Sequence, residues 1–238
     1  METKKNSKNS TASPKALAAR QHLAETALKL FAEKGFEKTT MRDLAKEAGV
    51  SLGHFYYHFS SKEEIVNVFY LETLSEIEEA CKKLKTETKK FEERYIGLVR
   101  ARMKTFERQR SLVIAISGVA VDPKSPLSPF GPATKEIRLR TIGLIEELID
   151  DSDFRCGENI APYAPTLLWY LMMGFIFYWV FDSSRKQART DELTERLTPL
   201  VLKLMRASRL PLAGTVLRPI HTILNDFIPL EARDEKLP

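Results

Sequence analysis

Three helix-start signals stand close together between residues 40 and 64. Thr40 and Ser61 are each followed three residues later by an acidic side chain, and Ser51 opens the segment LGHFYYHF. A hydroxyl in such a position accepts a hydrogen bond from an otherwise unpaired amide at a helix N-terminus. Gly49 ends the helix that Thr40 begins, so that helix has only about two turns. The segment therefore predicts short helices joined by tight turns.

A longer amphipathic helix is expected before this segment, over residues 16–34, because apolar side chains recur there at helical spacing before Gly35. Three helices with a glycine-bearing turn in fewer than 50 residues are typical of a helix-turn-helix. Gly49 allows the chain to reverse, and Ala45 allows the second and third helices to cross closely. The small core is expected to contain Leu44, Val50, Phe55 and Phe59.

The outward face of the third helix is then free to enter the major groove of DNA. It carries no acidic residue that would repel phosphate. Hydroxyl and imidazole groups on it can donate hydrogen bonds to phosphate oxygens, and Gly53 permits close approach of the backbone to base edges. Arg42 and Lys62 flank it and can contact the DNA backbone. The face consists of Leu52, Gly53, His54, Tyr56, Tyr57 and His58.

Charge agrees with this interpretation. Residues 1–60 hold ten Lys and Arg against six Asp and Glu, which is four of the net five positive charges of the chain. Such a basic end favours a polyanionic partner. Residues 1–15 are polar and basic without an apolar segment, and they are expected to form a flexible basic arm rather than a secretory signal.

The sequence gives little support for a metal site, a disulfide or an enzymatic activity. His54 and His58 have the spacing of two metal ligands on one helix face, but Phe55 stands where a zinc protease has glutamate, and no further ligand set is apparent. Cys81 and Cys156 lie far apart, as expected of unpaired thiols in a reducing cytosol. We therefore expect neither a metal nor a cofactor, and no enzymatic activity.

The stretch TTMRDLAKEAGVSLGHFYYHFSSKEEI, with the preceding ALKLFAEKGFEKTT, resembles the DNA-binding signature of the TetR (tetracycline-repressor-like) family over about residues 17–66. The resemblance implies a homodimer that binds a near-palindromic operator. Carried over by position, it implies DNA contacts from Thr40, Arg42, Leu52, Gly53, His54, Tyr56, Tyr57, His58 and Lys62, next to the helix cap Ser51. Leu52 departs from the polar or basic residue that is common there, so it offers no hydrogen bond to a base.

The rest of the chain is predicted to be helical. Residues 167–181 are uncharged and strongly apolar, but Asp182 ends the run before the ~20 residues that a membrane span needs. We expect a buried helix over 162–182, and a further helix over 191–208 that Thr190 caps. Four prolines predict a loop over 122–132. A last helix fits 212–227.

The predicted fold is all-α, with a helix-turn-helix head over 16–65, a ligand-binding and dimerisation domain over 66–228, and a charged tail over 229–238. The resemblance implies that residues 61–85 connect the two and that the helices of about 162–208 form the dimer interface. Trp169, Phe175 and Phe177 are candidates for that interface. An apolar pocket is expected from Tyr95, Arg102, Met103, Phe106, Trp169 and Met173.

Arg102 is the most informative of these residues, because a lone cation on an apolar stripe requires a carboxylate partner from the protein or from a ligand. The sequence thus predicts a cytoplasmic DNA-binding regulator, in first place a repressor that a small, largely apolar ligand releases from its operator. The alternative is a regulator or DNA-organising protein with the same head and without an effector. A cavity in the region 95–173 would distinguish the first from the second.

Overall fold

The computed structural model describes residues 13–210, and every regular element in this range is helical, as the sequence predicts. The expected arm falls mainly within residues 1–12, and the expected helix 212–227 and charged tail 229–238 also lie outside the described residues. The α-helices are α1 Pro14–Lys34, α2 Met41–Glu47, α3 Leu52–His58, α4 Lys62–Glu87, α5 Phe91–Glu107, α6 Arg110–Ala120, α7 Lys135–Asp150, α8 Ala164–Phe181 and α9 Ala188–Ala207.

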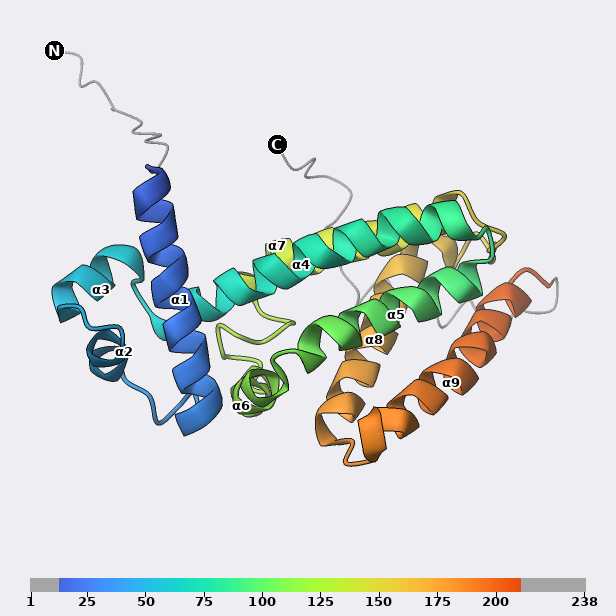
Figure 1. The fold of residues 1–238 in the computed structure, drawn as a ribbon. Helices are drawn as coiled ribbons and strands as arrows, with labels where there is room; N and C mark the ends of the chain where they lie inside the picture. The colour runs from blue at the N-terminus through green and yellow to red at the C-terminus, as the bar shows by residue number, and fades with distance from the viewer. Residues whose placement is uncertain (1–12, 211–238) are drawn as a thin grey trace, which may run out of the picture.

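The helices form a small head and a larger bundle (Figure 1). In the head, α1 lies between the pair α2–α3 and the rest of the molecule. The long helix α4 leaves the head and runs along the bundle, where it packs against α5 and α7. The short helix α6 packs against α1 and also contacts α5 and α8. Two elements, α4 and α6, therefore join the head to the bundle.

The helix caps predicted from sequence are present in the head. The Thr40 hydroxyl accepts a hydrogen bond from the Asp43 amide at 3.2 Å, and the Asp43 carboxylate accepts one from the Thr40 amide at 2.9 Å. The Ser51 hydroxyl caps α3 through the His54 amide at 3.1 Å. Gly35 ends α1 with φ of +89°, which only glycine adopts readily, although its ψ of 146° differs from the left-handed helical cap that was expected.

Two buried clusters of apolar side chains hold the fold together. The first joins α1, α2 and α3 to the beginning of α4, to α6 and to the end of α8; Phe31, Leu44, Phe55 and Phe69 belong to it. The second lies among α4, α5, α7, α8 and α9. Because the first cluster extends well beyond the head, the head is packed firmly onto the bundle.

The helix α8 is almost wholly apolar. By length and composition the segment Ala161–Phe181 could cross a membrane. In this fold it contacts α5, α6, α7 and α9, and Leu168, Met172 and Phe175 are buried against them. It serves as a core helix of the bundle, as the sequence predicts.

The corner between α8 and α9 is built around Asp182. Its carboxylate accepts hydrogen bonds from the Ser184 amide at 2.8 Å, the Thr190 amide at 2.9 Å and the Thr190 hydroxyl at 2.7 Å. Burial opposes ionisation of this carboxyl, but these hydrogen bonds outweigh burial and hold its pKa well below the ordinary value. The prediction that Thr190 caps α9 is therefore wrong: α9 begins earlier, and Thr190 is a buried residue that fastens the helix to Asp182.

We expect Asp182→Ala to lower the free energy of unfolding by about 2–3 kcal/mol, because it leaves buried donors of Thr190 without an acceptor. Urea denaturation measures this. Since the pKa is lowered from 3.8, the carboxylate stabilises the fold fully above that pH and progressively less below it, so the loss should be equal at pH 5 and pH 7. The control Asp191→Ala removes an exposed ion pair with Arg100 and should cost about 1 kcal/mol or less. Equal losses for the two variants would contradict the role of Asp182.

Candidate DNA-binding head and effector cavity

The outer face of α3 is open to solvent. Tyr57 is 81% exposed and Tyr56 is 50% exposed, and Gly53 and His54 are also exposed. Phe55 is fully buried on the opposite face, where it packs with Phe59. A solvent-exposed tyrosine at 81% contributes little to folding, so this face carries side chains that the fold itself does not need.

An interaction network fixes α3 relative to α1 and α4. The Glu64 carboxylate accepts hydrogen bonds from Arg20 at 2.7 Å and from the Ser60 amide at 2.8 Å. The Arg20 guanidinium also lies 4.3 Å from the centre of the Phe59 ring. Burial opposes ionisation of Glu64, but its hydrogen bonds to Ser60 and Arg20 lower the pKa. These contacts make α3 a rigid part of the head.

The other residues that the sequence predicts as DNA contacts differ in how exposed they are and in whether their side chains already have a partner. Arg42 is exposed at the start of α2, and Thr40, also exposed, is engaged with Asp43. Leu52 is half-buried and packs against the core of the head instead of standing free on the surface. The Lys62 ammonium donates to the Phe36 carbonyl at 2.7 Å and lies over the Phe36 ring, so it would contact DNA only after exchanging this partner.

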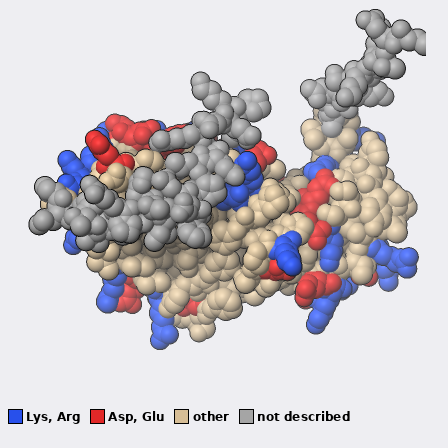
Figure 2. Space-filling view, turned by 180° about the vertical axis from the view of Figure 1, so that it is seen from behind, with Lys and Arg blue, Asp and Glu red and all other residues tan. Residues whose placement is uncertain are grey.

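His58 is half-buried at the end of α3, with its ring centre 5.1 Å from that of His54. Burial, with His54 and Arg20 nearby, lowers the pKa of His58. A neutral imidazole retains one N–H group that can donate a hydrogen bond. On the face of the molecule seen in Figure 2, Lys and Arg side chains stand at the outer edge of the head, with Asp and Glu side chains near them.

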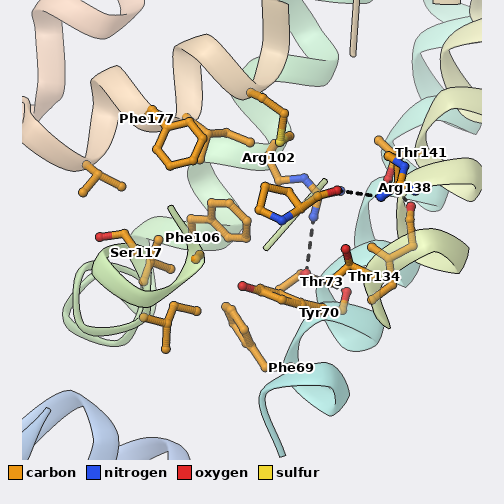
Figure 3. A pocket seen from close by; sticks show the side chains of 18 of the residues that line it. Phe69, Tyr70, Thr73, Arg102, Phe106, Ser117, Thr134, Arg138, Thr141 and Phe177 are labelled. Carbon is orange, nitrogen blue, oxygen red and sulfur yellow. Dashed lines mark hydrogen bonds between the residues drawn. The ribbon is translucent and has the colours of Figure 1, made fainter. Parts of the chain in front are cut away.

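A cavity of about 120 Å³ lies inside the bundle, in the region where the sequence predicts a pocket. Its walls come from α4, α5, α6, α7, α8 and the loop before α7. Figure 3 shows the aromatic rings of Phe69, Phe106 and Phe177 on one side and the polar side chains of Thr134, Arg138 and Thr141 on the other. The cavity therefore has an apolar part and a polar part.

Four residues of the predicted pocket line this cavity, namely Arg102, Phe106, Trp169 and Met173. Tyr95 does not: it is fully buried in the second cluster, and its hydroxyl donates to the Leu168 carbonyl at 2.6 Å. Met103 borders a separate groove beside α9. Sequence reasoning missed the lining residues of α4 and α7, among them Phe69, Tyr70, Thr73 and Arg138. The sequence feature that could have identified Phe69, Tyr70 and Thr73 as lining residues is their helical spacing.

Two of the three aromatic side chains expected at a dimer interface do not face outward. Trp169 and Phe175 are 2% and 1% exposed within the single chain, and Phe177 lines the cavity. The assignments of Trp169 and Phe175 are therefore wrong, because both side chains are buried inside the single chain, whereas Phe177 is half-buried at the cavity and its assignment stays a prediction. The outer face of α8 carries other large apolar side chains, including Tyr170, Tyr178 and Phe181.

Comparison with known proteins identifies the family. Residues 23–68 match the family described as "Bacterial regulatory proteins, tetR family". Residues 94–218, just over half of the chain, match the "Tetracyclin repressor-like, C-terminal domain". The chain belongs to the tetR family. The resemblance seen in the sequence of the head thus extends into the bundle.

Relatives of this TetR-family chain include named regulators. The uncharacterized HTH-type transcriptional regulator YerO of Bacillus subtilis is 31% identical over 147 residues, which cover 60% of this chain and 37% of that protein. The HTH-type transcriptional repressor KstR2 of Mycobacterium tuberculosis is 29% identical over 138 residues, which cover 57% of this chain and 69% of that repressor. The chain thus spans little more than a third of the length of the first relative.

The fold is also that of solved TetR-like structures. The transcriptional regulator FadR from Bacillus subtilis, solved in complex with stearoyl-CoA, aligns with a TM-score of 0.57 and 18% identity over 79% of this chain and 98% of that one. At this level of identity the likeness concerns the fold.

Two of the glycines in the TetR-family head, Gly49 and Gly53, give a matched stability test. Gly49 has φ of +66° and Gly53 lies within α3, and an added methyl group would meet no atom within 4 Å at either site. Gly49→Ala should therefore lower the free energy of unfolding by about 1 kcal/mol through backbone strain alone. Gly53→Ala should raise it by about 0.5 kcal/mol through helix propensity. Chemical denaturation of both variants checks this, and an equal sign for the two would refute the proposed turn geometry.

Proposed function

We propose that this protein is a cytoplasmic, homodimeric repressor of transcription that binds a near-palindromic DNA operator through α3 and releases it when a small, largely apolar ligand enters the bundle cavity. The family membership supports regulation of transcription, and KstR2 carries the name of a repressor. FadR was solved with stearoyl-CoA, whose long acyl chain is apolar, which supports an effector with an apolar part.

Proposed DNA contacts come from the exposed residues of α2 and α3. Arg42, Tyr56 and Tyr57 can reach phosphate oxygens from either side of the groove, while Gly53 and His54 can approach base edges. Thr40, Ser51, Leu52, His58 and Lys62 complete the proposed contact surface. Lys62 must leave the Phe36 carbonyl to take part, and Leu52 offers only its exposed apolar portion.

The observation that carries the proposal is that head and cavity share side chains. Six members of the cluster that holds the head also line the cavity, from α4, α5, α6 and α8: Phe69, Phe106, Val113, Ile116, Ala120 and Val180. A ligand that displaces these side chains changes the surface on which α1 and the beginning of α4 rest. A cavity in this place also favours a ligand-responsive regulator over a regulator without an effector.

The expected mechanism is a change in the separation of two heads. Half-sites on DNA lie ~34 Å or a multiple of it apart, so a small tilt of α4 in each subunit places the two α3 helices out of register. A ligand drives this change only if it binds the DNA-free conformation more tightly than the DNA-bound one. Ligand binding at the α4 and α6 walls can be coupled to the head in this way, since both helices contact α1.

Exposed apolar side chains on α8 and α9 support a dimer interface on these helices. Phe181 is 79% exposed and Tyr178 is 42% exposed on α8, and on α9 Leu200 and Leu204 are 53% and 65% exposed one turn apart. Large apolar side chains clustered at a surface mark protein interaction sites. In a homodimer a twofold axis would bring the same helices of both copies together as a four-helix bundle.

Arg42→Ala and Tyr57→Ala should each weaken binding to DNA selected by the wild-type protein from a random pool by at least about 10-fold, because each removes a DNA contact. Fluorescence anisotropy at fixed salt measures the affinity. The control Lys104→Ala removes an exposed cation of α5, away from α3, and should bind like wild type. Both head variants should keep the mass of the dimer, and wild-type affinity in both would exclude this face as the DNA-binding surface.

Leu204→Glu should convert the dimer to a monomer at micromolar concentration, because it places a charge in an interface that would exclude water. Size-exclusion chromatography with light scattering reports the mass. Leu17→Glu, at a residue of α1 with 57% exposure, is the matched control and should remain dimeric. An unchanged mass for Leu204→Glu would move the interface away from this part of α9.

A further inference from the structure

The side chain of Arg102 lacks the partners that a buried cation requires. It is 5% exposed and lines the cavity from α5. Its guanidinium donates a hydrogen bond to the Thr73 hydroxyl at 3.3 Å and lies 5.4 Å from the centre of the Phe106 ring (Figure 3). Within residues 13–210 no carboxylate forms an ion pair with it. Most of its five N–H donors therefore have no acceptor among these residues.

Another arginine of the same helix shows what a satisfied buried guanidinium looks like in this fold. Arg94 is 0% exposed, and it donates to the backbone carbonyls of Thr88, Leu148 and Lys85 at 2.7, 2.9 and 3.1 Å. It also lies 3.9 Å from the Asp151 carboxylate. Backbone carbonyls of α4, of α7 and of Thr88 thus satisfy Arg94, whereas Arg102 on the same helix lines the cavity.

Among residues 13–210, no group forms an ion pair with Arg102. Glu76, a carboxylate whose charge acts on Arg102, is already bound by Arg108 and accepts a hydrogen bond from Thr105 at 3.0 Å. Burial raises the pKa of Cys81 to about 12, so its thiol supplies no negative charge at neutral pH. Burial lowers the pKa of Arg102 to about 10, which still leaves it a cation. An uncompensated charge in an apolar site is costly, and a bound anion removes that cost.

The surroundings of Arg102 favour a carboxylate over a phosphate. Thr73 stands beside it, and the Tyr70 hydroxyl, for which no hydrogen bond to a described residue is found, projects into the same space in Figure 3. The second arginine of the wall, Arg138, donates to the carbonyls of Pro129 and Gly131 at 2.9 and 3.0 Å. A single free guanidinium fork matches the two oxygens of a carboxylate, whereas a phosphate carries more charge and more acceptor oxygens.

The volume of the cavity indicates a size for the apolar body of the ligand. An apolar cavity of about 150 Å³ holds benzene. The 120 Å³ found here therefore suits a body of about the size of a benzene ring or a short alkyl chain. Aromatic side chains such as Phe69, Phe106 and Trp169 provide the matching apolar walls.

We propose that the effector is a small amphipathic monocarboxylate whose carboxylate pairs with Arg102 while its aromatic or short aliphatic body fills the apolar part of the cavity. This inference rests on the proposed function, in which the cavity is the effector site, and it names the chemical class of the effector.

The test compares acids with their neutral amides on the full-length protein. Benzoate, phenylacetate, hexanoate and octanoate are titrated by isothermal calorimetry beside benzamide, phenylacetamide, hexanamide and octanamide, with hexanoyl-CoA as a thioester. Thermal melts follow the same ligands, since binding to the folded state raises Tm. At least one acid should bind at least about 10-fold more tightly than its amide and than hexanoyl-CoA, as expected for a charge-assisted hydrogen bond.

Arg102→Met should lower the affinity for that acid to the level of its amide while the affinity for the amide stays unchanged, which shows that the cavity is still folded. Arg100→Met is the matched control, because Arg100 lies on α5 but is exposed and paired with Asp191 and Glu195. It should keep the preference for the acid. If Arg102→Met does not fold, Arg102→Gln replaces it, and the comparison of acid with amide on the wild type needs no variant.

Three results would overturn the inference: no acid binds, the amide or the thioester binds as tightly as the acid, or the Arg102 variant keeps the preference. Release of DNA selected by the wild-type protein is measured with the same ligands, and this measurement distinguishes a failure of the inference from a failure of the proposed function. If the acids bind through Arg102 but the DNA stays bound, the proposed function fails and the assignment of the carboxylate site stands. If an amide binds equally well and releases the DNA, the assignment of the carboxylate site fails and the proposed function stands.

Discussion

The packing of Phe69, Phe106, Val113 and Ile116 is the interaction on which the rest of this structure depends. These side chains belong to the cluster that fixes the head, and they also form the wall of the cavity in the bundle. Close-packed interiors do not deform smoothly, so a change of volume on one side of such a wall is felt on the other. Head and bundle are thus two parts of one mechanical unit.

The helices α4 and α6 transmit such a change in different ways. Helix α4 is continuous from the head into the bundle, so a rotation anywhere along it moves the attachment of α3. Helix α6 is short and separate, and it presses on α1 from the side opposite to α2 and α3 (Figure 1). The sequence indicated only α4 as the connection that moves the head, because α6 begins 76 positions after the end of α1 in the chain.

The two buried arginines Arg94 and Arg102 of α5 differ in their contacts and in their effect on stability. Arg94 donates hydrogen bonds to backbone carbonyls near the ends of α4 and α7. Its guanidinium therefore stabilises the junction of α4, α5 and α7. Arg102 instead lines the cavity and donates to no backbone carbonyl of the described residues. A charge retained in an apolar site without a partner costs stability, and such residues persist mainly where they serve binding. The same residue type therefore stabilises the fold at one position and prepares a site at the other.

The sequence by itself determined the head. Its caps at Thr40 and Ser51, the turn at Gly49 and the buried face of Phe55 depend on interactions between residues a few positions apart, which local patterns specify. It also determined the all-helical class and the presence of a pocket near Arg102, Phe106, Trp169 and Met173. Residues that would face a second subunit could not be separated from residues facing the core, because α8 is apolar on every side and has no polar stripe to orient it.

Only the tertiary structure decided which way each apolar side chain of α8 points, that Tyr95 bonds to the Leu168 carbonyl, and that Thr190 serves Asp182 instead of beginning α9. It also decided that no carboxylate among residues 13–210 forms an ion pair with Arg102, since Glu76 pairs with Arg108. These outcomes depend on contacts between helices far apart in sequence, where small shifts in helix rotation change every neighbour. Local spacing carries no information about such rotations, and the packing of the whole chain fixes them.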